Sequence, residues 1–266
     1  MIPRMVVRFR RIAFLLLFFF AAVHLSGDRR VLAQPGDAEL SGKPPVIVIG
    51  FVGGFVSRTN SVHREVQLAA DLRREYPEGI YAQVFENHRS DDARQQIIRL
   101  LDTNHDGKLS ASEKQNARII IYGHSWGASE TVELARLLGR DGIPVVLTIQ
   151  VDSITKHGEN DSLIPPNVAE AVNYYQPDGI LHGTPLIRAA DPAHTQVLGN
   201  FRFDYKDHPV DCSAYPWIAR TLEKAHIEIE NDPRVWGEIE SLIRAKLPVA
   251  TTQALAASSS ASPSQR

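Results

Sequence analysis

The sequence predicts one α/β domain in which a mainly parallel sheet carries helices on both faces. Short continuous apolar runs fit strands buried on both faces, and segments with helical apolar spacing alternate with them, as in βα units. A Gly-x-Ser-x-Gly motif at 123–127 directly follows the apolar run 119–122, which is typical of a tight strand-to-helix turn. We place the domain at residues 45–248.

The predicted elements follow one another along this domain. Apolar runs predict the strands, and apolar residues spaced three and four apart predict the helices. The strands are expected at 45–50, 80–85, 118–122, 145–151, 169–175 and 196–203. The helices are expected at 61–75, 93–101, 128–138 and 235–247.

The two ends of the chain are expected to lie outside the fold. In residues 1–33, basic residues precede twelve apolar ones and the segment ends in Val-Leu-Ala, which predicts a cleaved secretory signal peptide. A membrane span needs about 20 apolar residues, so we expect no stable span after cleavage. The protein is therefore predicted to be exported, either periplasmic or secreted. Residues 34–44 are predicted to form a linker and 249–266 a disordered tail.

Charge and cysteine content exclude two further possibilities. The chain has a formal net charge of −2, and the leader carries six basic and one acidic side chain, so the mature chain has a charge of −7. It has no basic cluster beyond the leader, so we expect no nucleic-acid partner. Cys212 is the only cysteine, so no intrachain disulfide forms, and its thiol is expected to be buried or half-buried.

Ser125, at the centre of the Gly-x-Ser-x-Gly motif, is the predicted nucleophile. A turn of this kind lifts the serine hydroxyl above the sheet, and its glycines allow close backbone packing. A serine hydroxyl is a poor nucleophile, so it needs a histidine base that a carboxylate orients. His124, beside the serine, points away at such a turn, and we expect it to pack without reacting.

The acid should follow a strand downstream of the serine, and the histidine should come later still. Asp152 directly follows the run 145–151 and is the predicted acid. Asp204, after a later strand, is the main alternative, and Asp191 and Asp178 remain open.

His226, shortly before the Asp-Pro that opens the last predicted helix, is the predicted base, with His208 as the alternative. The oxyanion needs two backbone N–H donors. Trp126 follows the nucleophile and supplies one, while Phe51, or Val52 next to it, is expected to supply the other from the glycine-rich loop. The remaining histidines lack metal-ligand spacing and are expected in surface or loop roles: His63, His88, His157, His182 and His194.

A second motif occupies residues 102–113 and fits D-x-[DN]-x-[DN]-G-x5-E without a gap. This pattern resembles an EF-hand calcium loop, with a glycine at the sharp turn and a glutamate at position twelve. The predicted helix 93–101 enters it, and only a short helix fits before the next strand. We predict a structural Ca²⁺ bound by Asp102, Asn104, Asp106, the Lys108 carbonyl, Ser110 and Glu113.

The glycine loop at 50–54, the turn at 123–127, Asp152 and His226 occur in the order found in α/β-hydrolase-fold serine hydrolases. The chain resembles that family over most of residues 45–247. The resemblance implies acyl transfer to water, and its exported single-domain members are often lipases or esterases. Two features depart from the common pattern. The oxyanion loop lacks a His-Gly pair, and the acid follows the strand immediately after that of the nucleophile, as in certain lipases.

The sequence therefore predicts an exported serine hydrolase that cleaves carboxylic esters of small molecules or lipids through an acyl-enzyme, with a structural calcium ion. The same triad also fits a thioesterase, an acyltransferase or an amidase. A non-catalytic, calcium-binding exported protein on the same scaffold is the alternative from a different class.

Overall fold

The computed structural model describes residues 44–248. The predicted signal peptide, all but the last residue of the predicted linker and the predicted tail therefore lie outside the described residues. No helix within the described range is long and apolar enough to cross a membrane.

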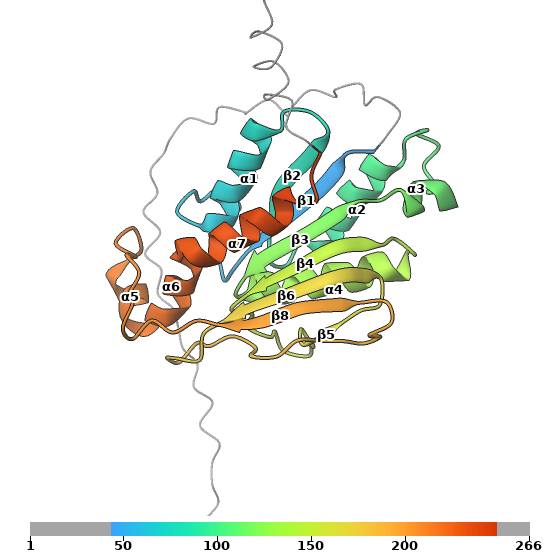
Figure 1. The fold of residues 1–266 in the computed structure, drawn as a ribbon. Coiled ribbons are helices and arrows are strands. Elements are labelled where there is room, and N and C mark those ends of the chain that lie inside the picture. The colour runs from blue at the N-terminus through green and yellow to red at the C-terminus, as the bar shows by residue number, and fades with distance from the viewer. Residues whose placement is uncertain (1–43, 249–266) are drawn as a thin grey trace, which may run out of the picture. The chain divides into compact units, whose positions relative to one another are not determined.

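Six strands form one sheet in the order β2-β1-β3-β4-β6-β8, and every neighbouring pair is parallel (Figure 1). The strands are β1 (Val46–Val52), β2 (Ile80–Glu86), β3 (Ile119–His124), β4 (Val145–Val151), β6 (Val168–Tyr175) and β8 (Gln196–Arg202). Two short strands, β5 (Leu163–Ile164) and β7 (Arg188–Ala189), pair separately. All six predicted strands are present, and the parallel sheet is confirmed.

Helices cover both faces of the sheet (Figure 1). The core between the sheet and α1 (Arg64–Glu75) and α7 (Pro233–Arg244) contains Val48 and Ile120. The opposite core, shared with α2 (Ser90–Leu101) and α4 (Trp126–Arg140), contains the adjacent Ile49 and Ile121. Successive strand residues point to opposite faces, so an all-apolar strand fills two cores at once. The chain has the α/β-hydrolase fold, as predicted.

Three shorter helices complete the described part of the chain: α3 (Ala111–Gln115), α5 (Trp217–Leu222) and α6 (Lys224–Asn231). The predicted helix boundaries differ from the observed ones by a few residues. The helix expected from residue 93 begins at Ser90, and the one expected from residue 61 begins at Arg64. The last helix begins at Pro233, where Asp232 accepts a hydrogen bond from the Arg234 amide and so caps it.

The carboxyl ends of the central strands bring distant segments of the chain together. The Ser125 amide donates to the Val151 carbonyl (3.0 Å), and the Asp152 amide donates to the Tyr174 carbonyl (2.7 Å). These bonds continue the parallel ladder one residue beyond β3 and β4. Ser125 and Asp152 therefore lie at the same edge of the sheet, where α/β folds usually place their binding sites.

Candidate active site

Ser125 stands between β3 and α4 in a strained conformation, with φ 59° and ψ −127°. Non-glycine residues rarely adopt positive φ, and such strain is concentrated at functional sites. The turn depends on close packing, because a Cβ at Gly127 would collide with the Phe51 carbonyl group. Ser125 is only 9% exposed. The predicted strand-to-helix turn is thus present, with its serine held at the edge of the sheet.

Asp152 is a fully buried carboxylate that is saturated with hydrogen bonds. Its backbone also has positive φ, 45°. It accepts from His226 Nδ1 (2.6 Å), the Gln176 amide (3.1 Å), Gln176 Nε2 (2.8 Å) and the Gly183 amide (2.8 Å). These four hydrogen bonds compensate the carboxylate for the loss of water.

His226 lies on α6, a helix that was not among those predicted from the sequence. Its segment, His-Ile-Glu-Ile-Glu, alternates in a way that does not suggest a helix, but packing of Ile229 into the core imposes one. Burial by itself lowers the pKa of His226, but the hydrogen bond and charge of Asp152 outweigh it, so the pKa is raised. Since Nδ1 donates to Asp152, Nε2 remains to act on a substrate or on Ser125.

The structure brings Ser125, Asp152 and His226 to the same place. The Ile154 amide, two residues after Asp152, donates to the Ser125 carbonyl (3.2 Å), and the ring of His124 lies 4.4 Å from that of His226. Among the described residues, the Ser125 hydroxyl makes no hydrogen bond to His226. Such contacts are often long in ligand-free sites and tighten when substrate binds.

The alternative triad members are not part of this arrangement. Asp204 and His208 are exposed, and the Asp204 carboxylate lies 3.5 Å from Arg202 Nη2. Asp191 pairs with His194 at 2.7 Å and Asp178 with Lys206 at 3.1 Å. The geometry therefore favours Asp152 and His226 over the alternatives that the sequence left open.

The oxyanion donors differ in part from the prediction. Trp126 opens α4, and its amide donates no hydrogen bond within the described residues, so it is free for a ligand. Phe51, however, lies within β1, paired with Phe85 on one side and Gly123 on the other. The backbone that approaches the serine comes later, because a Cβ added to Gly53 would lie 2.8 Å from the Ser125 Cβ.

The amides of Gly53 and Gly54 also donate no hydrogen bond within the described residues, unlike amides of the ladder. The geometry therefore favours the 53–54 turn over Phe51 or Val52 as the source of the second donor. The apolar pattern ended the strand at residue 50, whereas β1 runs to Val52.

His124 packs against the Asp152–His226 pair, and a packing role was expected for it. Its Nε2 donates to the carbonyl of His226 (3.1 Å), and its ring is 4% exposed. Burial lowers the pKa of His124 to about 4, so its ring is neutral near pH 7. A neutral ring with Nε2 protonated leaves the lone pair of Nδ1 facing away from His226.

A second buried cluster, which the sequence did not predict, lies next to His124. It consists of His63, Glu65 and Glu230, with ligand atoms that all lie within 4.8 Å of one another. His63 was expected to have a surface or loop role, but its Nδ1 contacts Glu230 Oε1 at 2.6 Å. Burial, together with the charge of Glu230, raises the pKa of Glu65 well above its ordinary value. In a helix, the spacing of four residues between His226 and Glu230 places both side chains on one side. The sequence analysis did not predict that helix, so the spacing could not be used.

The predicted calcium loop leads from α2 to α3, and α3 is as short as expected. Gly107 has φ +77°, and the Asp102 carboxylate accepts from the amides of Asp106 (3.2 Å) and Gly107 (3.0 Å). Glu113 belongs to a capping box with Ser110. Hydrogen bonds to Ser110, and then to Thr103, lower the pKa of Glu113 to about 2.

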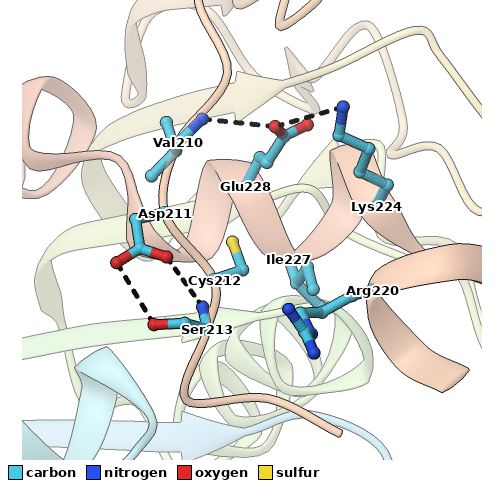
Figure 2. A pocket seen from close by; sticks show the side chains of 8 residues that line it. All are labelled: Val210, Asp211, Cys212, Ser213, Arg220, Lys224, Ile227 and Glu228. Carbon is cyan, nitrogen blue, oxygen red and sulfur yellow. Dashed lines mark hydrogen bonds and ion pairs between the residues drawn. The ribbon is translucent and has the colours of Figure 1, made fainter. Parts of the chain in front are cut away.

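Cys212 lies in a shallow hollow formed by the 210–213 segment, α5 and α6 (Figure 2). Burial raises the pKa of its thiol to about 12, so the thiol is an inert group near pH 7. Glu228 in the same hollow accepts from the Val210 amide (3.2 Å), which anchors that segment to α6. The hollow contains none of the triad residues.

No protein-family model and no curated protein matches the sequence. Similar solved structures include a cutinase-like protein from Cryptococcus sp. at 15% identity, covering 79% of this chain and 98% of that one, with a TM-score of 0.40. Human thioesterase 2 is 7% identical over 76% of this chain and 95% of that one, with a TM-score of 0.40. An arylesterase is 14% identical, with a TM-score of 0.29, over 42% of this chain and 38% of its own length. None of these likenesses bears on the reaction.

Proposed function

We propose that the protein is an exported serine hydrolase that cleaves carboxylic esters through Ser125, His226 and Asp152. The observation that carries this proposal is a strained serine beside a buried Asp152–His226 hydrogen bond of 2.6 Å. An aspartate bound to Nδ1 holds the imidazole in the tautomer whose Nε2 can take a proton from a hydroxyl.

In the first half of the reaction, His226 Nε2 accepts the Ser125 proton while the serine oxygen attacks the ester carbonyl carbon. The amide of Trp126 and an amide of the 53–54 turn stabilise the oxyanion. His226 then gives its proton to the leaving alcohol, which leaves an acyl-enzyme. Water, deprotonated by His226, attacks this ester and releases the acid and free Ser125. Asp152 stays charged throughout and stabilises the imidazolium.

An apolar group beside the reacting carbonyl suits the surface next to the serine. Phe55 is 87% exposed, and its ring packs edge to face on Trp126, the residue after the nucleophile, at 5.6 Å between centroids. An exposed aromatic ring is stabilised when it covers an apolar ligand. We infer that the substrate is a small-molecule ester or a lipid with an apolar acyl or aryl part.

Labelling with a fluorophosphonate probe tests the nucleophile. The wild-type protein should be labelled and should hydrolyse aryl and alkyl esters, while Ser125→Ala should lose both properties. Ser241→Ala, on the surface of α7, serves as the matched control and should behave as wild type. A thiol-blocking reagent should leave labelling unchanged, because Cys212 is buried and protonated. Equal labelling of Ser125→Ala and wild type would refute the assignment.

We also propose a structural Ca²⁺ in the loop at 102–113. The predicted ligands are all oxygens, which Ca²⁺ prefers, and the turn at Gly107 and the curvature around Asp102 suit such a loop. The ion would pin the connection between α2 and β3, the strand that leads into Ser125. Calorimetric titration should show about one equivalent of Ca²⁺, and chelation should lower the melting temperature. Absence of both effects would remove calcium from the proposal.

Export through residues 1–33 completes the proposal. Expression of the full chain in a secreting host should yield a mature protein whose first residue is Gln34. Recovery of an uncleaved, cytosolic protein would contradict this part alone.

A further inference from the structure

Four side chains from three elements meet beside the catalytic pair. His63 directly precedes α1, Glu65 lies in its first turn, Glu230 lies on α6, and His124 ends β3. Glu230 contacts His63 Nδ1 through Oε1 at 2.6 Å and faces His124 Nδ1 through Oε2 at 3.4 Å. The ligand atoms of His63, Glu65 and Glu230 all lie within 4.8 Å of one another, and His124 lies beside this cluster on the Glu230 side. The proposed triad uses none of these atoms.

Glu65 is the group in this cluster that is left without a partner. It is 0% exposed, and neither of its carboxylate oxygens has a hydrogen-bond partner within the described residues. Glu230 is 1% exposed and lies close enough to share a ligand with it. Two charged carboxylates that are buried side by side repel, so they share either a proton or a metal cation.

The orientation of His124 turns one of its ring nitrogens toward Glu230. The His226 carbonyl only accepts hydrogen bonds, so His124 Nε2 carries the proton that joins them at 3.1 Å. His124 Nδ1 faces the Glu230 carboxylate at 3.4 Å, so His124 borders the cluster on the side of β3.

We propose that this cluster is a binding site for a divalent transition metal of the zinc type, with His63, Glu65 and Glu230 as its protein ligands. One imidazole nitrogen and two carboxylate oxygens suit Zn²⁺, which binds three protein ligands where water supplies the fourth. Ca²⁺ and Mg²⁺ favour oxygen-only sets, so they should bind the loop at 102–113 and not this site. The inference does not depend on the proposed esterase activity.

The spacing and access of the ligands are compatible with such an ion. Ligand atoms around tetrahedral zinc lie about 3.3 Å apart, and those of His63, Glu65 and Glu230 all lie within 4.8 Å of one another. His63 and Glu230 are closer because a proton joins them, and metal binding would release that proton. The His63 side chain is 12% exposed, which provides a route from the solvent.

The ion would act as a structural clamp. It would tie the start of α1 to α6, which carries His226 four residues before Glu230. The position of the catalytic histidine would then depend on a metal that does not touch the substrate. Removal of zinc is therefore expected to lower the melting temperature as well as the activity.

The first test measures metal content and geometry in the full-length mature protein. Metal-stripped protein is titrated with Zn²⁺ in excess Ca²⁺, and mass spectrometry counts the bound ions. We expect one tightly bound zinc per chain that calcium does not displace. Replacement by Co²⁺ should give the strong visible absorption of a tetrahedral site. Failure to retain zinc, or displacement by calcium, would overturn the proposal.

The second test compares His63→Asn with His194→Asn. Loss of a ligand should weaken zinc binding by on the order of 100-fold or more. His194 also sits beside an acidic residue, Asp191 at 2.7 Å, but on the surface, so its variant should bind zinc as wild type does. If His63→Asn binds zinc as tightly as wild type, the site is wrong. If His63→Asn does not fold, the absorption spectrum of Co²⁺-loaded wild-type protein serves as the test. Absence of the bands of a tetrahedral site would then refute the proposed metal site.

Discussion

Asp152 and Glu65 are both fully buried carboxylates near the carboxyl edge of the sheet, yet their surroundings are opposite. Asp152 accepts four hydrogen bonds, from His226, Gln176 and Gly183. Glu65 accepts none within the described residues, and its nearest neighbours include a second carboxylate, that of Glu230. Asp152 thus has enough donors for a negative charge, whereas Glu65 needs either a proton or a cation between it and Glu230.

This difference fits two roles that a buried acid can have, which are orienting a histidine and binding a metal. Donors around Asp152 hold one charge in one place, which suits a residue that orients a catalytic histidine. The carboxylate oxygens of Glu65 accept no hydrogen bond within the described residues. This suits metal ligation, because a ligand atom must keep its lone pairs available. The following predictions test this contrast, beginning with the largest expected effect.

The largest effect should follow from Asp152→Asn. The amide keeps the shape of the side chain but favours the wrong tautomer of His226, so kcat/KM should fall by roughly 10⁴-fold. Steady-state kinetics on an aryl ester measures this loss, with Asp204→Asn as the control. A larger loss in the Asp204 variant would move the acid to that residue.

The pH dependence should reveal His226. It acts as a base only when neutral, so kcat/KM should rise with pH through a midpoint above 6.5, since Asp152 raises its pKa. Below that midpoint, the rate should fall about tenfold per pH unit. Asp152→Asn should move the midpoint lower, because burial alone lowers this pKa. A midpoint that also moves in His208→Asn would argue against His226.

Glu65→Met should have a smaller effect whose sign depends on zinc. In metal-free protein the change removes an unpaired buried carboxylate, which should stabilise the fold by about 1–3 kcal/mol. In zinc, wild type should gain stability and the variant should not. Thermal unfolding with and without zinc measures both, and Glu78→Met on the surface should change little. Destabilisation of the metal-free variant would mean that Glu65 has a partner.

The smallest effect is expected in the exposed loop at 102–113, where Ser110 and Glu113 form the capping box of α3. Ser110 caps α3 and binds Glu113, so Ser110→Ala should cost about 0.5–2 kcal/mol, or about 2–4 °C in melting temperature per kcal/mol. Ser112→Ala, in the same helix but outside the cap, is the control. Ser110 also donates hydrogen bonds to the Glu113 carboxylate, which lower the pKa of Glu113 to about 2. The part of the stability that comes from these bonds should persist at pH 7 and disappear as the pH falls from about 4 toward 2. Equal melting temperatures for both variants at pH 7 would contradict the role of the cap.

Some site residues were predictable because their signals are local. Ser125 follows a buried strand inside a turn motif, and Asp152 directly follows the next strand, so neighbouring residues suffice to place both at the sheet edge. His226 was selected by chain order, although its helix was not predicted. Phe51 was misplaced because the apolar pattern does not show where a strand ends among glycines. His63 and Glu65 carry no local signal at all.

By itself, the sequence determined the parallel sheet, the two-sided core and the serine turn, because apolar periodicity and glycine constraints act over a few residues. Only the tertiary structure favours Asp152 over Asp204, His226 over His208, and the 53–54 turn over Phe51 as the backbone that approaches the serine. It alone also joined Glu65 to Glu230, which lie far apart in the chain. The physical reason is that the burial and pairing of a charge depend on neighbours that the folding of distant segments brings together.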